Sequence, residues 1–253
     1  MNAQVINEAR RELAARRPGL QLSPVAVLIC AYEEEANLGA VLKDVPAEAC
    51  GMETTTVVVV DGGQDRTAEI ALESGAVSLV FPVNQGHGVA LRAGYDLCVE
   101  AGARYVVTLD ADGQNDPAEI PVLLQPLVDD EADFVLASRR LGIDETVDPV
   151  RKAGVVVFAW LMNRLTGSHL TDTSNGYRAL RASMLSDVAC RLEQPQYQTA
   201  ELLILCLTRG WRVTERPTVW RERMSGHSKK GSNLRFGLRY AGVIVATWLR
   251  ARS

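Results

Sequence analysis

The chain has 253 residues, of which 47% are hydrophobic and 23% are charged, a composition that excludes a disordered or fibrous protein. The formal net charge is −4, but residues 209–253 contain eleven Lys or Arg against two Glu, and residues 1–208 sixteen against twenty-nine Asp or Glu. This asymmetry predicts an anionic ligand or surface that meets the basic C-terminal part, with a solvated helix face as the alternative.

The chain offers no apolar run of about twenty residues, so we expect no segment that spans a bilayer. Residues 153–162 and 241–249 are shorter apolar runs, and we interpret each as a core helix or as a helix that rests on a membrane surface. The absence of a signal-peptide pattern and of any CxxC pair favours a cytoplasmic protein and allows a peripheral contact with the inner face of the membrane.

Residues 1–20 are expected to form a polar, helical N-terminal extension that ends at Pro18-Gly19. Apolar and β-branched runs then predict strands at residues 25–32, 54–61, 76–81, 103–110 and 132–139. Between them, helical spacing predicts helices at residues 36–44, 66–75, 86–102 and 117–130. Strands that alternate with helices imply a mostly parallel, Rossmann-like α/β sheet flanked by helices.

The second half of the chain is less regular. It predicts, in order, a helix, a turn with a short strand, a helix, a strand and a Gly/Ser/Lys-rich loop at residues 151–166, 172–180, 199–209, 211–220 and 224–233. We interpret this half as an elaboration on the same sheet, which leads to one domain over residues 21–232. Residues 233–253 are expected to form a C-terminal helix that can associate with a membrane.

Polar residues end several of the predicted strands, at 32–34, 61, 110–112 and 138–139. Because ligands bind at the carboxyl ends of parallel strands, we expect these residues to meet at one edge of the sheet. The stretch "YVVTLDADGQNDP" (105–117) places Asp110 and Asp112 directly after a buried strand. Carboxylates this close repel unless something positive lies among them. The pattern therefore predicts a Mg²⁺ or Mn²⁺ site, with a solvent-screened acidic turn as the alternative.

Several segments together resemble the family 2 glycosyltransferases of the GT-A fold, and most closely the dolichyl-phosphate (polyprenyl-phosphate) mannose synthase branch. They occur in the family's order from about residue 25 to residue 232: "AYEEEANL", "VVVDGGQDRTAEIA", "NQGHGVALRAG", "LDADGQNDP", "ASRR", "TDTSNGYRALR" and "RERMSGHSKKG". The metal motif "LDADGQNDP" and the R-x-x-G-x-S-K loop are the most distinctive of them.

The resemblance implies a nucleoside-diphosphate sugar, GDP- or UDP-hexose, as the donor. It implies that the nucleotide is bound by residues that match the family's motifs: Ala31, Tyr32, Glu34, Asp61, Asp65, His87, Asp110 and Ala111. The cation that bridges the diphosphate would be held by Asp110, Asp112 and Gln114, with Asp112 and Gln114 as the direct ligands. The resemblance further implies a catalytic set made of Asp112, Arg139, Arg151, Asp172, Arg178, Glu201, Arg223 and Lys229.

Within this set, the residues at the family's basic positions are Arg139, Arg151, Arg223 and Lys229. Asp172 and Arg178 match the family's acceptor side. Fixed Arg and Lys donors, together with a cation, would stabilise the negative charge that grows on the departing diphosphate. The loop at residues 223–230 would fold over the phosphates. The sequence departs from the family's pattern at Val60, Glu33, Cys30 and His87, where Asp, Asn, Pro and Lys are usual. Val60 leaves the nucleotide base open, and His87 fits either a phosphate contact or an ordinary surface position.

The acceptor decides whether a general base is needed. A hydroxyl must lose a proton to a nearby carboxylate or His, whereas a polyprenyl phosphate is already anionic near neutral pH. We therefore expect metal-dependent, inverting transfer of a hexose to a polyprenyl (dolichyl-type) phosphate. One alternative is a hydroxyl acceptor of a glycolipid or secondary metabolite, with Asp172 or Glu201 as the base. Another is a sugar-nucleotide-binding module without turnover.

Two other function classes are disfavoured. A nicotinamide dehydrogenase would carry G-x-G-x-x-G after the first strand, and the chain does not. Nucleic-acid binding is disfavoured because the basic residues carry little aromatic interleaving and most of the chain is acidic.

Overall fold

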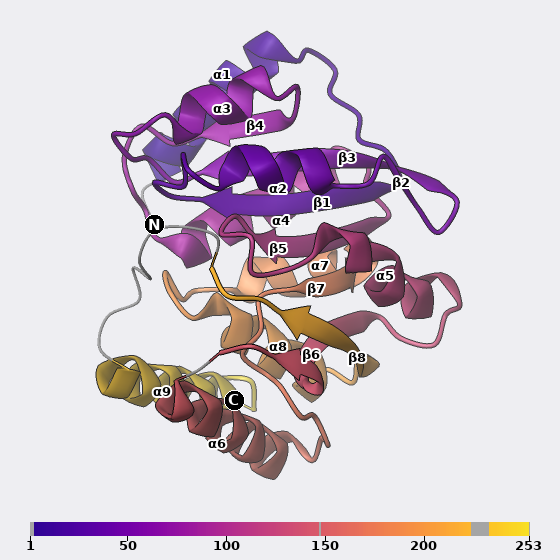
Figure 1. The fold of residues 1–253 in the computed structure, drawn as a ribbon, viewed down its shortest axis with the longest axis vertical. Coiled ribbons are helices and arrows are strands. Elements are labelled where there is room, and N and C mark those ends of the chain that lie inside the picture. Colours follow the sequence, from indigo (N-terminus) through magenta and orange to yellow (C-terminus); the bar gives the residue numbers. More distant parts are fainter. Residues whose placement is uncertain (1–2, 147, 224–232, 253) are drawn as a thin grey trace.

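The part of the chain that the computed structural model describes, residues 3–146, 148–223 and 233–252 without the side chains of 233–236, contains one large sheet (Figure 1). Its strands are β1 (Val25–Ala31), β2 (Glu48–Ala49), β3 (Met52–Val60), β4 (Val77–Val80), β5 (Tyr105–Asp110), β6 (Phe134–Asp144), β7 (Arg178–Arg181) and β8 (Val213–Trp220). They are arranged in the order β2-β3-β1-β5-β7-β6-β8, and β4 also pairs with β3.

Three of the strands that end in polar residues, β1, β3 and β5, are parallel neighbours, whereas β7 separates β6 from them. β1 lies between β3 and β5 and is parallel to both, and β4 is parallel to β3. β7 is antiparallel to β5 and to β6, whereas β8 is parallel to β6. The predicted α/β sheet is therefore confirmed, but it is more mixed than the alternation predicted. The cause is β7, a four-residue strand that inserts between β5 and β6 with reversed direction.

Helices cover both faces of this sheet (Figure 1). They are α1 (Ala3–Arg16), α2 (Leu38–Asp44), α3 (Thr67–Glu73), α4 (His87–Glu100), α5 (Ile120–Val128), α6 (Pro149–Thr166), α7 (Ala182–Val188), α8 (Gln198–Thr208) and α9 (Asn233–Arg250), with short 3₁₀ turns at Pro117–Glu119 and Ala189–Arg191. The helices α4, α6 and α8 begin and end within two residues of the predicted bounds, whereas α7 was not predicted.

Alternate residues of the central strands enter two separate hydrophobic cores. In β1, Leu28 packs into the core formed with α1, α4, α7 and α8, and Ile29 packs into the core formed with α2, α3 and α5. Val57 and Val58 of β3 divide in the same way. Successive side chains of a strand point to opposite faces, so a strand buried on both faces needs a continuous apolar sequence. This packing holds the carboxyl ends of β1, β3 and β5 at one rigid edge.

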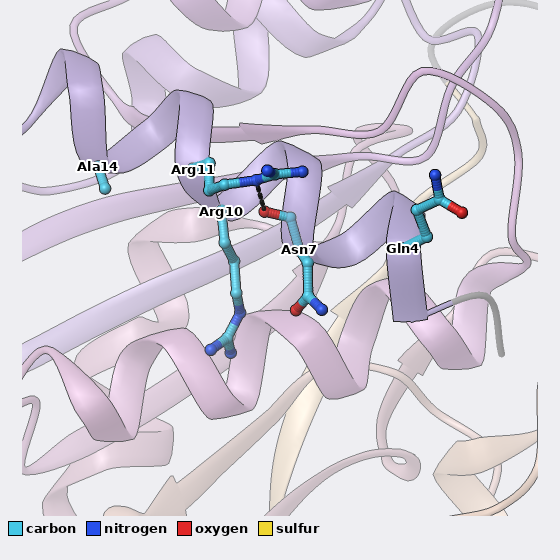
Figure 2. Close-up of a pocket in the computed structure, with 5 residues that line it drawn as sticks. All are labelled: Gln4, Asn7, Arg10, Arg11 and Ala14. Atoms are coloured by element: carbon cyan, nitrogen blue, oxygen red, sulfur yellow. Dashed lines mark hydrogen bonds between the residues drawn. The ribbon is translucent and has the colours of Figure 1, made fainter.

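The N-terminal helix α1 is part of this domain. Val5, Ala9 and Leu13 recur every four residues and are buried in the first core. Arg10 extends from α1 toward the helix beneath it (Figure 2), where it pairs with Glu100 of α4 at 2.8 Å. The polar extension expected over residues 1–20 is helical, but its apolar stripe packs on the domain. Gln4, Asn7, Arg10, Arg11 and Ala14 line a shallow hollow on its outer side (Figure 2).

The helices α6 and α9 contact each other at the end of the molecule farthest from α3 (Figure 1). Phe158 of α6 and Tyr240 of α9 stack with ring centroids 4.6 Å apart. Val155, Ala159 and Met162 form the buried side of α6, but its other side exposes Val157 and Trp160. The run at 153–162 is therefore only partly core. Among the described residues, no helix combines the length and apolar character needed to cross a bilayer.

A close approach between β6 and β8 supplies a test of the fold. A Cβ at Gly142 would lie 2.1 Å from the backbone oxygen of Thr218. We expect Gly142→Ala to push the two strands apart and to lower the free energy of unfolding by about 1–3 kcal/mol, measured by urea denaturation.

The matched control is Gly154→Ala in α6, where the nearest atom to an added Cβ is Phe158 Cε2 at 3.6 Å. An alanine in a helix interior should raise the free energy of unfolding by about 0.5–1 kcal/mol. Equal effects of the two substitutions would contradict the close approach in the structure.

Candidate active site

The loops that follow β1, β3 and β5 leave the same edge of the sheet because these strands are parallel neighbours. Across this edge, the guanidinium of Arg223 contacts carboxylates from two of the loops. Its Nη1 lies 3.2 Å from Asp112 Oδ2, and its Nη2 forms an ion pair with Glu34 Oε1. The three side chains are only 11–18% exposed. Residues that are far apart in the sequence thus form one compact charged cluster.

The metal motif is held by the segment that follows β8. Asp112 Oδ1 accepts a hydrogen bond from the backbone nitrogen of Gln114 at 3.1 Å. Gln114 Nε2 donates to the backbone oxygen of Arg221 at 3.1 Å. In return, the backbone nitrogen of Arg221 donates to the backbone oxygen of Gln114 at 2.9 Å. These contacts bring the chain just before Arg223 against the motif. The glycine at Gly176 leaves room for the Asp110 carboxylate, since a Cβ there would lie 3.1 Å from its Oδ1.

The oxygen atoms of this motif fit a divalent cation whose remaining ligands come from a phosphate. Among the described residues, no group of three or more His, Cys, Asp and Glu is arranged to hold a metal alone. Asp110 and Asp112 could provide carboxylates, and because Gln114 Nε2 contacts Arg221, the amide oxygen of Gln114 is available as a third ligand atom. Mg²⁺ is usually held by one or two carboxylates plus substrate phosphates. The guanidinium of Arg223 beside Asp112 shows that positive charge is already accommodated here.

Two of the predicted nucleotide-binding carboxylates hold the backbone of the loops. Asp61 is buried and accepts hydrogen bonds from the backbone nitrogens of Gln85 at 2.7 Å and Gly86 at 2.9 Å. Burial raises the pKa of Asp61, although these two hydrogen bonds partly oppose the shift. Asp65 accepts from the backbone nitrogens of Glu35 and Thr67, each at 3.1 Å. Both carboxylates therefore shape the loops around the site, and a direct contact of either with nucleotide stays a prediction.

The other predicted nucleotide-binding residues lie along the same edge. Ala31 is the last residue of β1 and Ala111 follows β5, and both are buried. Tyr32 is half-buried next to the exposed Glu33, whose charge raises the pKa of the tyrosine hydroxyl. His87 is the exposed first residue of α4. Their contact with a nucleotide stays a prediction.

Arg139 and Asp172 form a buried ion pair beside the edge. Arg139 Nε lies 2.6 Å from Asp172 Oδ2, and Arg139 Nη2 lies 2.9 Å from Asp172 Oδ1. Asp172 also accepts from the backbone nitrogens of Arg139 and Ser174. Burial alone would raise the pKa of Asp172, but Arg139 outweighs it and lowers that pKa. A carboxylate that is buried, ionised and bonded in this way is poorly placed to accept a proton from a hydroxyl.

Trp220, the last residue of β8, lies against two of the predicted catalytic arginines. The Cζ of Arg139 is 4.9 Å from its ring centroid, and the Cζ of Arg151 is 5.5 Å from it. Burial and the charge of Arg139 lower the pKa of Arg151. Trp220 was not predicted to have a functional role. The signal that could have revealed it was its position at the end of the strand 211–220, directly before the basic loop.

Arg178 and Glu201 are buried and bond to other parts of the domain, and the catalytic role expected for them stays a prediction. Arg178 donates to the backbone oxygens of Asn175, Thr199 and Thr173 at 2.7, 2.6 and 3.1 Å, and burial lowers its pKa. This guanidinium holds the loop before β7 against the start of α8.

Glu201 accepts from the backbone nitrogens of Glu193 and Gln194, each at 3.0 Å, and pairs with Arg250 of α9. The geometry therefore favours a structural role for both Arg178 and Glu201. Lys229 lies outside the described residues, as does most of the loop at 223–230.

The chain matches the family model described as Glycosyl transferase family 2 over residues 26–189, which is more than half of its length. The match covers β1 through β7, and therefore includes the metal motif, Arg139, Arg151 and Asp172.

Curated relatives match most of the chain. A dolichyl-phosphate hexose transferase of Haloferax volcanii is 36% identical over 206 residues, which cover 81% of this chain and 86% of the relative. An undecaprenyl-phosphate 4-deoxy-4-formamido-L-arabinose transferase of Edwardsiella ictaluri is 31% identical over 239 residues, which cover 90% of this chain and 70% of the relative.

The fold is also similar to solved structures. The glucosyl-3-phosphoglycerate synthase of Mycobacterium tuberculosis, crystallised with Mn²⁺, uridine diphosphate and phosphoglyceric acid, superposes with a TM-score of 0.67. The two chains share 21% identity, and the superposition covers 95% of this chain and 81% of that one. This likeness confirms the predicted GT-A type of fold.

The Arg139–Asp172 pair gives a prediction for stability. Asp172→Asn leaves a buried guanidinium without its counter-charge and should lower the free energy of unfolding by about 3–5 kcal/mol. Because the pKa of Asp172 is lowered in the folded protein, the stabilisation it provides is present above the usual carboxyl pKa of about 3.9 and is lost as the pH falls through the lowered pKa.

Urea unfolding of wild type and Asp172→Asn across the acidic range measures both effects. Glu131→Gln, which removes a half-exposed pair with Arg216, is the control and should cost about 0–1 kcal/mol. A stability gap between wild type and Asp172→Asn that does not shrink on acidification would contradict this account.

Proposed function

The chain belongs to glycosyltransferase family 2, and from this premise we propose that it transfers a hexose from a nucleoside-diphosphate sugar to a polyprenyl phosphate with inversion. The observation that carries the proposal is the charged cluster of Glu34, Asp112 and Arg223 at the edge of the sheet. A glycosyltransferase must bind a diphosphate and then stabilise it as it departs. The cluster supplies carboxylates for a cation and a guanidinium for phosphate oxygens in one place.

The proposed mechanism rests on charge stabilisation. Asp110, Asp112 and Gln114 would hold Mg²⁺ or Mn²⁺, which when bound neutralises part of the charge on the leaving diphosphate. Arg223 contacts the Asp112 carboxylate that would bind the cation, and its remaining N–H groups would donate to phosphate oxygens. Arg139 and Arg151 would add positive charge near the motif. Preorganised groups of this kind usually contribute more to the rate than any other single effect.

The class of acceptor depends on whether a carboxylate in the site is available as a general base. A hydroxyl acceptor needs a base, but Asp172 is locked by Arg139, and Glu201 is buried with Arg250. A polyprenyl phosphate is already ionised and needs only cationic groups to position it. The names of the relatives, which act on dolichyl and undecaprenyl phosphates, support the same class of acceptor.

A lipid acceptor requires access to a membrane surface, and the pair α6–α9 offers one. The exposed fractions of Val157 and Trp160 on α6 are 55% and 64%, and those of Leu238 and Leu249 on α9 are 68% and 58%. Apolar side chains on one helix face with basic residues nearby are typical of helices that lie in the membrane interface. We propose that this pair rests on the inner face of the membrane. Arg151 in the first turn of α6 would then lie near the level of lipid phosphates.

The direct test is transfer in vitro. The protein is incubated with GDP- and UDP-hexoses, Mg²⁺ or Mn²⁺ and a short polyprenyl phosphate, and the products are identified by mass spectrometry. We expect a hexosyl polyprenyl phosphate, and we expect Asp112→Asn to reduce the rate about 10²–10³-fold through loss of charge stabilisation.

Asp44→Asn, at the exposed end of α2, is the matched control and should retain the parental rate. Transfer to hydroxyl compounds with none to polyprenyl phosphate would overturn the proposed acceptor. An Asp112→Asn variant with the parental rate would overturn the proposed metal site.

Membrane docking is tested separately by vesicle sedimentation with anionic phosphatidylglycerol. We expect Trp160→Ser and Leu249→Ser each to weaken binding about tenfold, because burial of a large apolar side chain contributes roughly 1.5–3 kcal/mol. Leu72→Ser on α3 also removes an exposed apolar side chain and should leave binding unchanged. Unaltered sedimentation of both helix variants would rule out α6–α9 as the docking surface.

A further inference from the structure

Two cations lie against the ring of Trp220, the last residue of β8. Trp220 is 2% exposed, and the guanidiniums of Arg139 and Arg151 lie 4.9 and 5.5 Å from its ring centroid. The end of the strand is anchored, since the backbone nitrogen of Glu145 donates to the Trp220 oxygen at 3.0 Å and Asp144 is the register partner of Trp220. The ring is therefore a rigid platform that joins β8, β6 and α6.

Two guanidiniums against one ring repel each other, and the structure compensates them differently. Arg139 is paired with the carboxylate of Asp172, which accepts hydrogen bonds from its Nε and Nη2. Arg151 has no such partner: among the described residues, no carboxylate forms an ion pair with it. The described contact that holds its guanidinium is the face of Trp220.

The kind of contact determines what Arg151 can do next. A carboxylate binds the edge of a guanidinium and uses its N–H donors, which lie in the guanidinium plane. An aromatic ring attracts the cation through its quadrupole without accepting hydrogen bonds from those donors. A ring can thus fix the position of Arg151 and leave its donors and charge for a ligand. The carboxylates of Asp112, Asp144 and Asp110 lie close enough for their charges to act on Arg151, and two of the three belong to the metal motif.

From this arrangement we infer that Trp220 is a positioning residue, which places Arg151 beside Arg139 as a paired cationic site for a phosphoryl group at the metal motif. The inference rests on the proposed function for the identity of that phosphoryl group, which is either the diphosphate of the donor or the phosphate of the acceptor. Trp220 acts through Arg151 and does not touch substrate. A residue of the core alone would stabilise the fold without influencing anion binding.

The test weakens the ring's attraction without changing its size. Trp220 is replaced by fluorinated tryptophans with one to four fluorine atoms, incorporated at that codon, because fluorine withdraws electron density from the face of the ring. Binding of inorganic phosphate and of inorganic pyrophosphate to the full chain is measured by calorimetry, and the melting temperature is recorded in parallel. We expect the dissociation constants to rise stepwise, by about 3- to 30-fold in total, while the melting temperature falls by a few degrees at most.

Three comparisons make the result specific. The same analogues at Trp211, whose Nε1 donates to Asp187 on another part of the surface, should leave phosphate binding unchanged. In Arg151→Gln the fluorination series should have a smaller effect, since only the contact of the ring with Arg139 remains. In the transfer assay, a rise in the KM for polyprenyl phosphate assigns the site to the acceptor, and a rise in the KM for the nucleotide sugar assigns it to the donor.

Unchanged affinities for phosphate and pyrophosphate across the series would overturn the inference, as would equal losses at Trp211. The binding measurements do not require turnover. Failure of the proposed transfer reaction therefore leaves this test intact, and the two failures are distinguishable.

Discussion

Carboxylates that lie close together at one edge of the sheet repel one another, and arginine side chains around the site offset this repulsion. Glu34 and Asp112 come from different loops and share the guanidinium of Arg223. Parallel pairing of β1 with β3 and β5 brings those loops together, so the charge cluster is a direct consequence of the sheet. A site with this balance attracts a cation together with an anion, which is the chemistry of a metal-bound diphosphate.

The arginines of the chain are distinguished by what neutralises them. Arg139 is paired with a buried carboxylate, Arg178 is held by backbone oxygens, and Arg151 faces an aromatic ring. A guanidinium whose N–H groups donate to protein oxygens stabilises the fold. A guanidinium held by an aromatic ring keeps its N–H groups available for a ligand. Arginines in neighbouring motifs can therefore have different roles. Family membership places these arginines in the chain but does not separate their roles.

Much of the fold could be predicted because its signals are local. The continuous apolar runs of β1 and β3 and the helical spacing of α4 each appear within one short stretch. The antiparallel insertion of β7 could not be predicted, since its four residues carry no sign of which strands they will pair with. The helix α1 was predicted, but its packing on the domain was not, because its three buried residues Val5, Ala9 and Leu13 lie among polar ones.

The sequence by itself determined the family, the strand ends and the oxygen-rich motif, because each is written in consecutive residues with a fixed spacing. The tertiary structure decided which charged groups remain available for chemistry. Asp172, Arg178 and Glu201 were all expected to be catalytic, but they bond to partners that lie 33, 21 and 49 residues away. Pairing at that separation depends on packing of the whole domain, which also brings Arg223 across 111 residues to Asp112.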